Sequence, residues 1–468
     1  MKIKNICCIG AGFVGGPTMA VIALKCPDIS INVVDINEEK INLWNGNYHT
    51  LPVKEPGLSS IIKKVRGKNL FFSTDVKKAI ENAEMIFMAV NTPTKTEGKG
   101  KGYAADLKYI INCAEQISKD ANSNKIIIEK STLPVRTAEM IKNILSKNKK
   151  FKFEILSNPE FLAEGTAIDD LFKSDRVLIG SDNTESGKVA SDLLIEIYER
   201  WIPKNKIIKT NVWSSELSKL VSNAMLAQRI SSINSISSIC EQTGADIEEV
   251  SKAVGMDKRI GSEFLKPSIG FGGSCFKKDI LNLVYIARTY NLDEVADYWE
   301  GVVSINYYQT NRISDKVKSI IGKDIANNSI AILGWAFKKN TNDSRESASI
   351  YLTQNLLASG GKVKIFDPMV NKQDILNDIK KALTEKKYKK DNIQEFLTRV
   401  TICNDEYDTF YNSSIAVICT EWDQFKKLNW KLIFKTMISP KYIIDGRNIL
   451  DKERLQHIGF KTYTIGQI

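Results

Sequence analysis

Apolar residues near the start of the chain fall into short runs separated by polar or glycine-rich turns. A run over residues 3–9 predicts a strand, GAGFVGG predicts a tight turn, and residues 17–24 predict an apolar helix. A second run over residues 31–34 predicts another strand, which ends at Asp35. This succession of strand, turn, helix and strand predicts a βαβ unit and therefore a parallel sheet.

The glycine turn fits a dinucleotide-binding fingerprint. Gly10, Gly12 and Gly15 match G-x-G-x-x-G between a predicted strand and a predicted helix. Asp35 follows about 20 residues later, where a carboxylate can bind a ribose 2′-hydroxyl and would repel a 2′-phosphate. The pattern therefore predicts NAD, rather than NADP, as the cofactor.

Three further apolar runs, at residues 85–90, 126–128 and 154–156, predict strands that are each followed by a polar turn. In an open parallel sheet the ligand lies beyond the carboxyl ends of the strands, so we expect these turns to border one crevice. Thr92, Thr132 and Glu160 are therefore candidate site residues. A role as a helix cap or turn residue fits each of them equally well.

Residues 214–242 have a different pattern, with no proline or glycine and with apolar residues at helical spacing. The pattern predicts one helix, roughly 43 Å long at 1.5 Å per residue, which exceeds what one domain needs. We expect it to connect domains or to pack against a partner subunit. Lys219 and Asn223 are four residues apart and share a face, either as site residues or as a solvated surface.

A second α/β pattern begins near residue 327. SIAILGWAFKKNTNDSRES predicts a strand, a glycine turn and a polar loop, and GGKVKIFDP predicts a turn, a strand and an acid. Further strands are expected at residues 415–419 and 442–444. Only Gly334 remains of the three fingerprint glycines, so we do not expect this unit to hold a dinucleotide in the usual way.

Together the patterns predict an α/β protein with two Rossmann-like doubly wound domains joined by a long central helix. The expected domains are an NAD-binding domain at residues 1–212, a central helical domain with a dimer interface at residues 213–325, and a second Rossmann-like domain at residues 326–468. A cleft between the two α/β domains is the natural place for a substrate.

Composition narrows the functional classes. The formal net charge is +11, but the lysines are spread along the chain among 55 acidic residues, which indicates a solvated surface and not a nucleic-acid-binding stripe. Two histidines exclude a three-histidine metal site, and we expect no metal. Eight cysteines without CxxC spacing, no signal-peptide layout and no long apolar stretch indicate a soluble, cytoplasmic protein with reduced thiols.

One cysteine has an unusual setting, in GFGGSCFKKD. The apolar stripe that follows predicts that Cys275 opens a helix, where the helix dipole, Lys277 and Lys278 would favour the nucleophilic thiolate. Asp279 would return to the same side one turn later. The glycines before the cysteine would let a ligand approach the backbone closely. The alternative is a small buried cysteine at a tight turn.

An NAD fold with an activated thiol predicts a particular chemistry. Oxidation of an alcohol to a carbonyl needs an acid or base, whereas a thiol becomes useful when the aldehyde is oxidised again. The thiol adds to give a thiohemiacetal, loss of a hydride gives a thioester, and water releases an acid. The prediction is a four-electron oxidation of a primary alcohol to a carboxylate with two NAD.

Several long motifs carry a resemblance to a known family. GAGFVGGPT, VNTPTK, EKSTLPVRT, NPEFLAEGTAI, ELSKLVSNAMLAQRISSINSI, GFGGSCFKKD and CTEWDQF resemble the UDP-glucose/GDP-mannose dehydrogenase family, in particular its animal-like UDP-glucose 6-dehydrogenase branch. The match covers nearly the whole chain in order. It implies oxidation of UDP-glucose to UDP-glucuronate. GDP-mannose or a UDP-N-acetylhexosamine is the alternative substrate, and a silent nucleotide-sugar-binding protein is an alternative of another class.

The resemblance implies roles for individual residues. Cys275 would be the nucleophile and Lys219 would stabilise the developing alkoxide, which suits a fixed positive charge. Asp279 with Thr132 would position or activate a water. Lys219 and a water bound by Asp279 remain competing candidates for the group that deprotonates the alcohol.

The resemblance also implies ligand contacts, with Glu160 as a further catalytic carboxylate and Asn223 holding the sugar. The implied NAD contacts are Gly10, Gly12, Phe13, Val14, Gly15, Asp35, Lys40, Val90, Thr92, Thr94, Ser131, Thr132, Glu164, Cys275, Lys278 and Arg345. The implied UDP-sugar contacts, with the domain at residues 326–468 as the UDP-sugar-binding domain, are Glu160, Phe161, Leu162, Lys219, Asn223, Arg259, Lys266, Phe271, Gly272, Phe337, Lys338 and Arg447.

The resemblance finally implies an assembly. Arg259 resembles an arginine that crosses from a neighbouring subunit, so a dimer would be the smallest competent unit of a homo-oligomer. Members of this branch often form hexamers built from dimers, and we expect the same here. Nucleic acid and membranes are not expected as partners.

Overall fold

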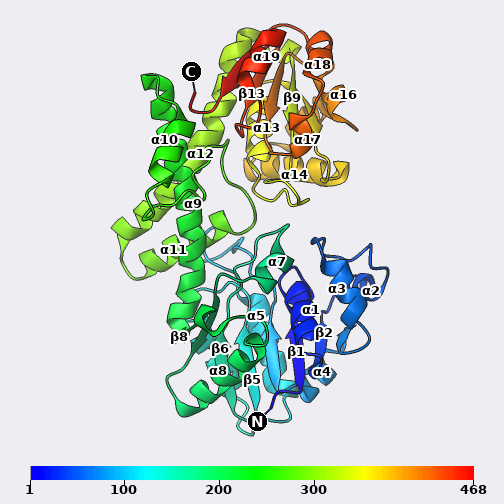
Figure 1. The fold of residues 1–468 in the computed structure, drawn as a ribbon, viewed down its shortest axis with the longest axis vertical. Helices are drawn as coiled ribbons and strands as arrows, with labels where there is room; N and C mark the ends of the chain where they lie inside the picture. Colours follow the sequence, from blue (N-terminus) through cyan, green and yellow to red (C-terminus); the bar gives the residue numbers. More distant parts are fainter. Residues whose placement is uncertain (1, 468) are drawn as a thin grey trace. The chain divides into compact units, whose positions relative to one another are not determined.

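The computed structural model describes residues 2–467 and divides them into two compact units. The first unit runs to Ser222 and includes Leu281–Asn291, and the second comprises Asn223–Ile280 and the chain from Leu292 onward. The helices α9 (Val212–Thr243) and α11 (Phe276–Thr289) contribute residues to both. Each unit contains one sheet with helices packed on it (Figure 1).

In the described part of the first unit, one sheet has the strand order β3-β2-β1-β4-β5-β6-β7-β8. The expected open parallel sheet is present from β3 to β6. It does not continue unchanged, because β6 and β7 pair antiparallel through Ser157 and Gly180. The strands are β1 (Asn5–Ile9), β2 (Ser30–Val34), β3 (Leu70–Ser73), β4 (Met85–Met88), β5 (Lys125–Glu129), β6 (Phe153–Ser157), β7 (Val177–Ser181) and β8 (Ile207–Asn211).

Both faces of this sheet are covered by apolar side chains. Ile6 and Cys8 of β1 belong to the core on one face, and Cys7 and Ile9 to the core on the other. Because successive side chains of a strand point to opposite faces, a strand buried on both is a continuous apolar run. The helices of this unit are α1 (Gly15–Lys25), α2 (Glu38–Asn45), α3 (Leu58–Val65), α4 (Val76–Asn82), α5 (Lys108–Asp120), α6 (Thr137–Leu145), α7 (Ala167–Phe172) and α8 (Glu185–Tyr198).

The helix α9 is continuous over 32 residues, close to the predicted range. Its start is capped by Asn211, whose side-chain oxygen accepts a hydrogen bond from the Ser214 N–H at 2.8 Å. Two helices follow it in the second unit, α10 (Ile247–Gly255) and α12 (Asp293–Ile321). Within residues 2–467, no helix has both the length and the apolar character needed to cross a membrane.

The second unit contains a parallel sheet in the order β11-β10-β9-β12-β13-β14. Its strands are β9 (Ser329–Leu333), β10 (Lys362–Phe366), β11 (Val400–Ile402), β12 (Ile415–Ile418), β13 (Tyr442–Asp445) and β14 (Lys461–Thr464). Its helices are α13 (Ala348–Ala358), α14 (Lys372–Glu385), α15 (Lys390–Thr398), α16 (Glu406–Phe410), α17 (Asp423–Lys426), α18 (Trp430–Thr436) and α19 (Lys452–Ile458).

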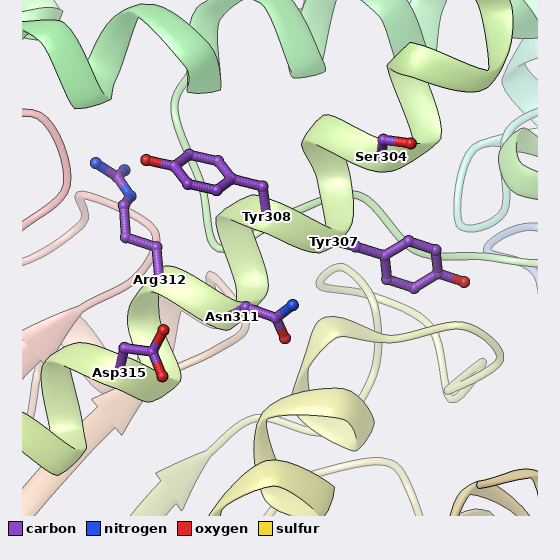
Figure 2. Close-up of a pocket in the computed structure, with 6 residues that line it drawn as sticks. All are labelled: Ser304, Tyr307, Tyr308, Asn311, Arg312 and Asp315. Carbon is purple, nitrogen blue, oxygen red and sulfur yellow. The ribbon is translucent and has the colours of Figure 1, made fainter. Parts of the chain in front are cut away.

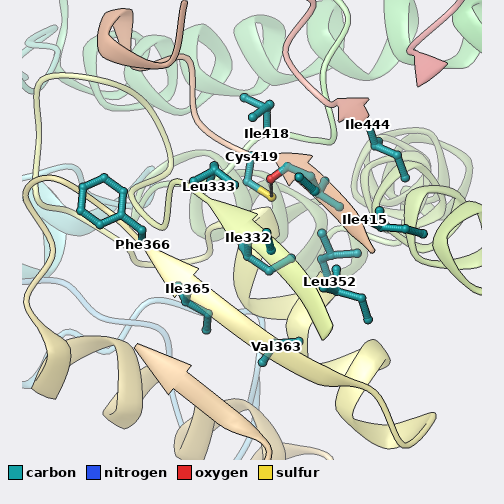
Figure 3. Close-up of a cluster of buried hydrophobic side chains, with 14 of the residues drawn as sticks. Ile332, Leu333, Leu352, Val363, Ile365, Phe366, Ile415, Ile418, Cys419 and Ile444 are labelled. Atoms are coloured by element: carbon teal, nitrogen blue, oxygen red, sulfur yellow. Dashed lines mark hydrogen bonds between the residues drawn. The ribbon is translucent and has the colours of Figure 1, made fainter. Parts of the chain in front are cut away.

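The centre of this second sheet is fully buried. Ile332 and Leu333 of β9 pack with Ile365 of β10 and Ile418 of β12 in one apolar cluster (Figure 3). Each such side chain contributes about 1.5–3 kcal/mol when it is removed from water. The cluster makes the central strands a rigid base for the loops that follow their carboxyl ends.

Candidate active site

The glycine turn after β1 needs glycine at two positions for lack of space. A Cβ on Gly10, whose φ is +110°, would lie 2.3 Å from the Ala89 carbonyl oxygen, and a Cβ on Gly15 would lie 2.0 Å from the Gly10 carbonyl oxygen. At Gly12 no atom of the described residues lies within 4 Å of such a Cβ. The turn is therefore tightly packed at Gly10 and Gly15 and open at Gly12, as the close approach of a pyrophosphate requires.

Asp35, directly after β2, faces this turn. Its carboxylate accepts hydrogen bonds from the N–H groups of Ala11 and Asn37, both at 3.0 Å, and from Lys40 Nζ at 2.9 Å. Burial acts to raise the pKa of Asp35, but these hydrogen bonds outweigh it and hold the pKa below its ordinary value. The neighbouring Ile36 is 86% exposed, so an apolar side chain lies bare beside the acid.

The turns after β4 and β5 touch each other, as the sequence predicted. The Thr92 hydroxyl donates to the Thr132 carbonyl oxygen at 3.0 Å, and the Ser131 hydroxyl donates to the Val90 carbonyl oxygen at 2.6 Å. Thr94 lies farther along the first turn, in a bridge to Ala105. Four predicted cofactor contacts therefore meet at the ends of two neighbouring strands.

The turn after β6 carries a buried ion pair. Lys219 Nζ of α9 lies 3.2 Å from Glu160 Oε1, and both side chains are less than a tenth exposed. The Leu162 N–H donates to Glu160 Oε2 at 2.6 Å, and Lys219 Nζ also lies 5.3 Å from the centre of the Phe161 ring. Glu164 follows in the same turn and is half-buried. The structure thus joins the candidate acid of the third turn to the candidate lysine of the long helix.

Sequence reasoning missed a second buried lysine beside this pair. Lys130 is 4% exposed, and its Nζ donates to Asn158 Oδ1 at 3.1 Å and to the Tyr198 hydroxyl at 3.3 Å. Burial lowers the pKa of Lys130 to about 8, with Glu160 opposing the shift and Lys219 adding to it. The missed signal was a lysine directly after an apolar strand, at the same strand end as Thr132.

In the second unit, Cys275 directly precedes α11 and is the exposed cysteine among the described residues; the other seven are buried or half-buried. Its carbonyl oxygen accepts from the Asp279 N–H at 2.8 Å, the first helical hydrogen bond. The loop before it is fixed by polar side chains that sequence reasoning also missed. Asn306 Oδ1 accepts from the Phe271 N–H at 2.7 Å, and Gln309 Nε2 donates to the Ser268 carbonyl oxygen at 2.7 Å.

Asn223 and Asp279 form a buried pair in the second unit. Asn223 Nδ2 donates to Asp279 Oδ2 at 2.6 Å, and Lys278 Nζ lies 3.7 Å from the other carboxylate oxygen. Asp279 is 1% exposed. The structure therefore joins Asn223 of α9 to Lys278 and Asp279, which lie within one helical turn of Cys275 along the chain.

Two glycines before the cysteine have a packing role that sequence reasoning did not indicate. A Cβ on Gly272 would lie 2.8 Å from Phe337 Cβ and 2.7 Å from the Glu346 carbonyl oxygen, and a Cβ on Gly273 would lie 3.1 Å from the Phe337 ring. These glycines make room for another loop of the same unit. The close approach of a ligand to the backbone here stays a prediction.

Predicted UDP-sugar contacts lie on the loop that carries Phe337 and Lys338 and on the loop after β13, which carries Arg447. Arg447 Nε donates to the Cys419 carbonyl oxygen and one of its terminal nitrogens donates to the Phe337 carbonyl oxygen, both at 2.7 Å. Glu421 lies 3.4 Å from the same guanidinium, and Lys338 Nζ lies 5.6 Å from the centre of the Phe337 ring. Arg447, Phe337 and Lys338 therefore gather beyond the carboxyl ends of the central strands.

The remaining predicted contacts lie in several places. The Arg345 backbone carbonyl oxygen accepts a hydrogen bond from the Gly273 N–H at 2.8 Å, so Arg345 adjoins the cysteine loop. Phe271 is buried with its ring edge-on to Phe276. Lys266 and Arg259 are exposed, and the Arg259 side chain bonds to Asp257, outside these groupings. Phe13 and Val14 are half-buried in the first glycine turn.

Comparison with known families identifies the chain. Models of an NAD binding domain, a central domain and a UDP binding domain of one family match residues 4–202, 213–308 and 331–452. The chain belongs to the UDP-glucose/GDP-mannose dehydrogenase family. The predicted resemblance is therefore confirmed.

Individual members of the UDP-glucose/GDP-mannose dehydrogenase family match over nearly their full length. The chain is 55% identical to the UDP-glucose 6-dehydrogenase of Drosophila melanogaster over 466 residues, covering 99% of this chain and 96% of the relative. It is 52% identical to UDP-glucose 6-dehydrogenase 4 of Arabidopsis thaliana over 471 residues, covering 99% and 97%. A solved UDP-glucose dehydrogenase from Pyrobaculum islandicum superposes with a TM-score of 0.83 at 26% identity, covering 100% of this chain and 98% of that one.

Membership of the UDP-glucose/GDP-mannose dehydrogenase family confirms the predicted fold class and NAD as the cofactor. The geometry of the first unit fits NAD. Gly12 leaves open space at the start of α1, and Asp35 presents a carboxylate at the end of β2 while it also accepts from the Ala11 N–H of the glycine turn. Both features match what the phosphates and the adenosine ribose of a dinucleotide require.

Proposed function

We propose that the protein oxidises UDP-glucose to UDP-glucuronate with two NAD per sugar. The observation that carries this proposal is Cys275, an exposed thiol at the start of a helix in a chain that also has an NAD binding domain. The names of its relatives, UDP-glucose 6-dehydrogenase, support UDP-glucose as the substrate that we propose for this chain. A helix start favours the thiolate form because of its positive dipole end.

The steps balance as follows. The sugar's primary alcohol loses its hydroxyl proton to a base and a hydride to give an aldehyde. The Cys275 thiolate adds to that aldehyde, and the thiohemiacetal loses a second hydride to become a thioester. Water attacks the thioester, the thiolate leaves, and the carboxylate is released. NAD, when bound, accepts the hydride in each oxidation.

The polar residues divide this work. The Lys219 ammonium, held by Glu160, stabilises the oxyanions of both oxidations. Asn223 orients Asp279 and the sugar, and Asp279 with Thr132 positions the hydrolytic water. The alcohol's proton leaves to a water on Asp279 or to the neutral amine form of Lys219, which thereby becomes the ammonium that stabilises the oxyanion.

The ligand contacts that we propose follow the same division. NAD is bound by the glycine turn, by Asp35 and Lys40, and by the two turns that carry Val90 and Ser131. Phe13, Val14, Thr92, Thr94, Thr132, Glu164, Cys275, Lys278 and Arg345 complete this set. The UDP-sugar is bound by Phe161, Leu162, Arg259, Lys266, Phe271, Gly272, Phe337, Lys338 and Arg447. We propose the domains at residues 1–212, 213–325 and 326–468 for NAD binding, connection and UDP-sugar binding.

We also propose that the protein is a cytoplasmic homo-oligomer, with a dimer as its smallest competent unit and a hexamer as its full assembly. Exposed apolar side chains on α9 support this, since Met225 is 53% and Ile239 is 56% exposed. On α12, Tyr308 is 49% exposed and lines an open pocket of about 510 Å³ together with Arg312 (Figure 2). Arg259 extends into solvent, where it can reach a partner's site.

The proposed reaction is tested by its stoichiometry. With UDP-glucose limiting and NAD in excess, we expect two NADH per sugar, because the thioester route completes the second oxidation before release. Absorbance of NADH and chromatography of the sugar nucleotide measure this. One NADH per sugar would mean that the aldehyde escapes.

No NADH from UDP-glucose would contradict the proposed substrate. GDP-mannose and UDP-N-acetylhexosamines, tried in the same assay, then separate the related dehydrogenase activities. No NADH from any of them would point to a nucleotide-sugar-binding protein without catalysis.

The choice of NAD is tested by Asp35→Asn. Losing the carboxylate weakens the bond to the ribose hydroxyl and removes the repulsion of a 2′-phosphate, so we expect KM for NAD to rise about tenfold and the preference over NADP to shrink. Initial rates with both cofactors measure this.

The matched control is Asp367→Asn in the second unit. Asp367 follows β10 as Asp35 follows β2, and it accepts from the N–H groups of Trp335 and Ala336 at 2.6 and 3.0 Å. We expect this variant to unfold at a lower temperature while KM for NAD stays unchanged. An equal rise in KM in both variants would contradict the assignment of Asp35.

A further inference from the structure

Two carboxyl groups meet in the interior of the first unit. Glu129 is the last residue of β5 and is 1% exposed, and Glu216 lies on the first turns of α9 and is 3% exposed. Each is among the groups that shift the pKa of the other. Two carboxylates this close, away from water, cannot both ionise near neutral pH.

The hydrogen bonds around the pair distinguish the two members. Glu216 accepts from the N–H groups of Arg136 and Ala138, both at 2.8 Å, at the start of α6. Neither oxygen of Glu129 accepts a hydrogen bond from a donor within residues 2–467. Two N–H donors favour the ionised form of a carboxylate, and a lack of donors favours the acid. Burial raises the pKa of Glu216 to about 7, and its hydrogen bonds oppose that shift, whereas the pKa of Glu129 is raised further by burial and by Glu216. Glu216 is therefore the member that ionises first, and Glu129 holds the shared proton and donates it toward Glu216.

The cations that lie nearest to the pair along the chain have other partners. Burial raises the pKa of Glu129 well above its ordinary value, and the Glu216 carboxylate adds to the shift. The Arg136 guanidinium bonds to Glu139 and stacks 4.2 Å from the centre of the Trp213 ring. Lys130, next to Glu129 in the chain, donates to Asn158 and Tyr198, and Lys219, three residues after Glu216, pairs with Glu160. The groups that face Glu216 are Glu129 and the backbone N–H groups at the start of α6.

The carboxyl pair links the two ends of a short segment that carries two proposed site residues. The segment consists of residues 130–135, and it lies between Glu129 and Arg136 in the chain. Both of these flanking residues interact with Glu216. Ser131 and Thr132 lie inside the segment. Arg136 has a φ of +80°, a left-handed conformation that costs about 1–2 kcal/mol for a residue other than glycine. The bond from its N–H to Glu216 helps to hold that turn.

The same pair reaches the reactive lysine. Glu216 and Lys219 are three residues apart on α9 and therefore lie on neighbouring positions of one helix face. One side chain thus ties the Ser131–Thr132 segment to the helical turn that holds the Lys219–Glu160 ion pair.

We propose that Glu129 and Glu216 are positioning residues that share one proton and hold the Ser131–Thr132 segment against the Lys219 turn of α9. The inference rests on the proposed function for its catalytic consequence. The shared proton itself is independent of that function and can be measured without substrate.

The decisive variants are isosteric and differ only in position. Glu129→Gln keeps a donor toward Glu216, so we expect kcat within about twofold of the wild type at about pH 7. Glu216→Gln places an NH2 group against one of two backbone N–H groups, so we expect kcat to fall at least about tenfold while KM for UDP-glucose changes less than about threefold. The reverse asymmetry, or equal effects, would overturn the assignment of the proton to Glu129.

The proton is observed directly by infrared difference spectroscopy of the unliganded protein at neutral pH. We expect the wild type to show a protonated-carboxyl band that shifts in D2O, and Glu129→Gln to lack it. Absence of this band from the folded wild type would refute the proposal, even if Glu216→Gln failed to fold. Failure of the proposed function would instead leave the band intact and abolish NADH formation by the wild type.

The pair also predicts a pH dependence of stability. A carboxyl whose pKa is raised by folding destabilises the folded state progressively as the pH rises above the unfolded pKa, here near the ordinary value of 4.5. We therefore expect the Tm of Glu129→Gln, relative to the wild type, to increase with pH above this value. A constant Tm difference between acid and neutral pH would contradict a raised pKa at Glu129.

Discussion

Replacing Cys275 by Ser is expected to lower UDP-glucuronate formation by at least about 10³-fold, because a serine hydroxyl in this position is almost never ionised and cannot form the thioester. NAD affinity should be retained, since serine replaces the sulfur by an oxygen and leaves the glycine turn and Asp35 of the first unit unchanged. The measurements are turnover with UDP-glucose and titration of NAD against the variant.

A matched control is Cys403→Ser, a half-buried cysteine of the second unit that takes no part in the proposed site. Its turnover should remain within about twofold of the wild type, as is typical of substitutions away from a site. Alkylation distinguishes the same two residues, because exposed Cys275 should react first and its modification should stop turnover. Full UDP-glucuronate production by Cys275→Ser would remove the covalent route altogether.

The strands that position this chemistry were predictable where burial is complete. The central residues of β1, β4 and β5 are apolar and buried on both faces, so each strand contains a continuous apolar run that is followed by a polar turn. The rule that ligands lie beyond the carboxyl ends of such strands then selected Thr92, Thr132 and Glu160. The contact between Thr92 and Thr132 in the structure follows from that geometry.

The reversed direction of β7 was not predictable, because the same apolar run fits a strand of either direction. The direction of β7 is decided only by the strand with which it pairs. The pairing of β7 with β6 is limited to Ser157 and Gly180. Likewise, the crowding of Gly272 and Gly273 by Phe337 involves residues more than sixty positions apart, which no local pattern records.

The buried polar residues were missed for a related reason. Glu129 and Lys130 stand in the turn sequence EKST, which resembles an ordinary solvated turn. Asn306 and Gln309 lie on a helix whose exposed face is also polar. Charge alone does not tell a buried group from a solvated one, and these residues become recognisable only when their partners, far away in the sequence, are placed around them.

Lys219→Met is expected to lower kcat by about 10²–10³-fold or more, because the fixed positive charge at the developing oxyanion is lost. A second effect must be separated from this one. Removal of one partner from a buried ion pair leaves the other charge uncompensated and costs about 3–5 kcal/mol of stability. Here that charge is on Glu160, 3.2 Å from Lys219 Nζ.

The double variant Lys219→Met/Glu160→Gln separates the two effects. The neutral amide keeps an oxygen for the Leu162 N–H but leaves no unpaired charge, so thermal stability should return toward the wild type while kcat stays low. Lys209→Met controls for loss of a lysine as such, since Lys209 is exposed and pairs with Asp192 at the surface. Recovery of kcat together with stability in the double variant would mean that Lys219 acts through folding alone, and the oxyanion would then need another source of positive charge.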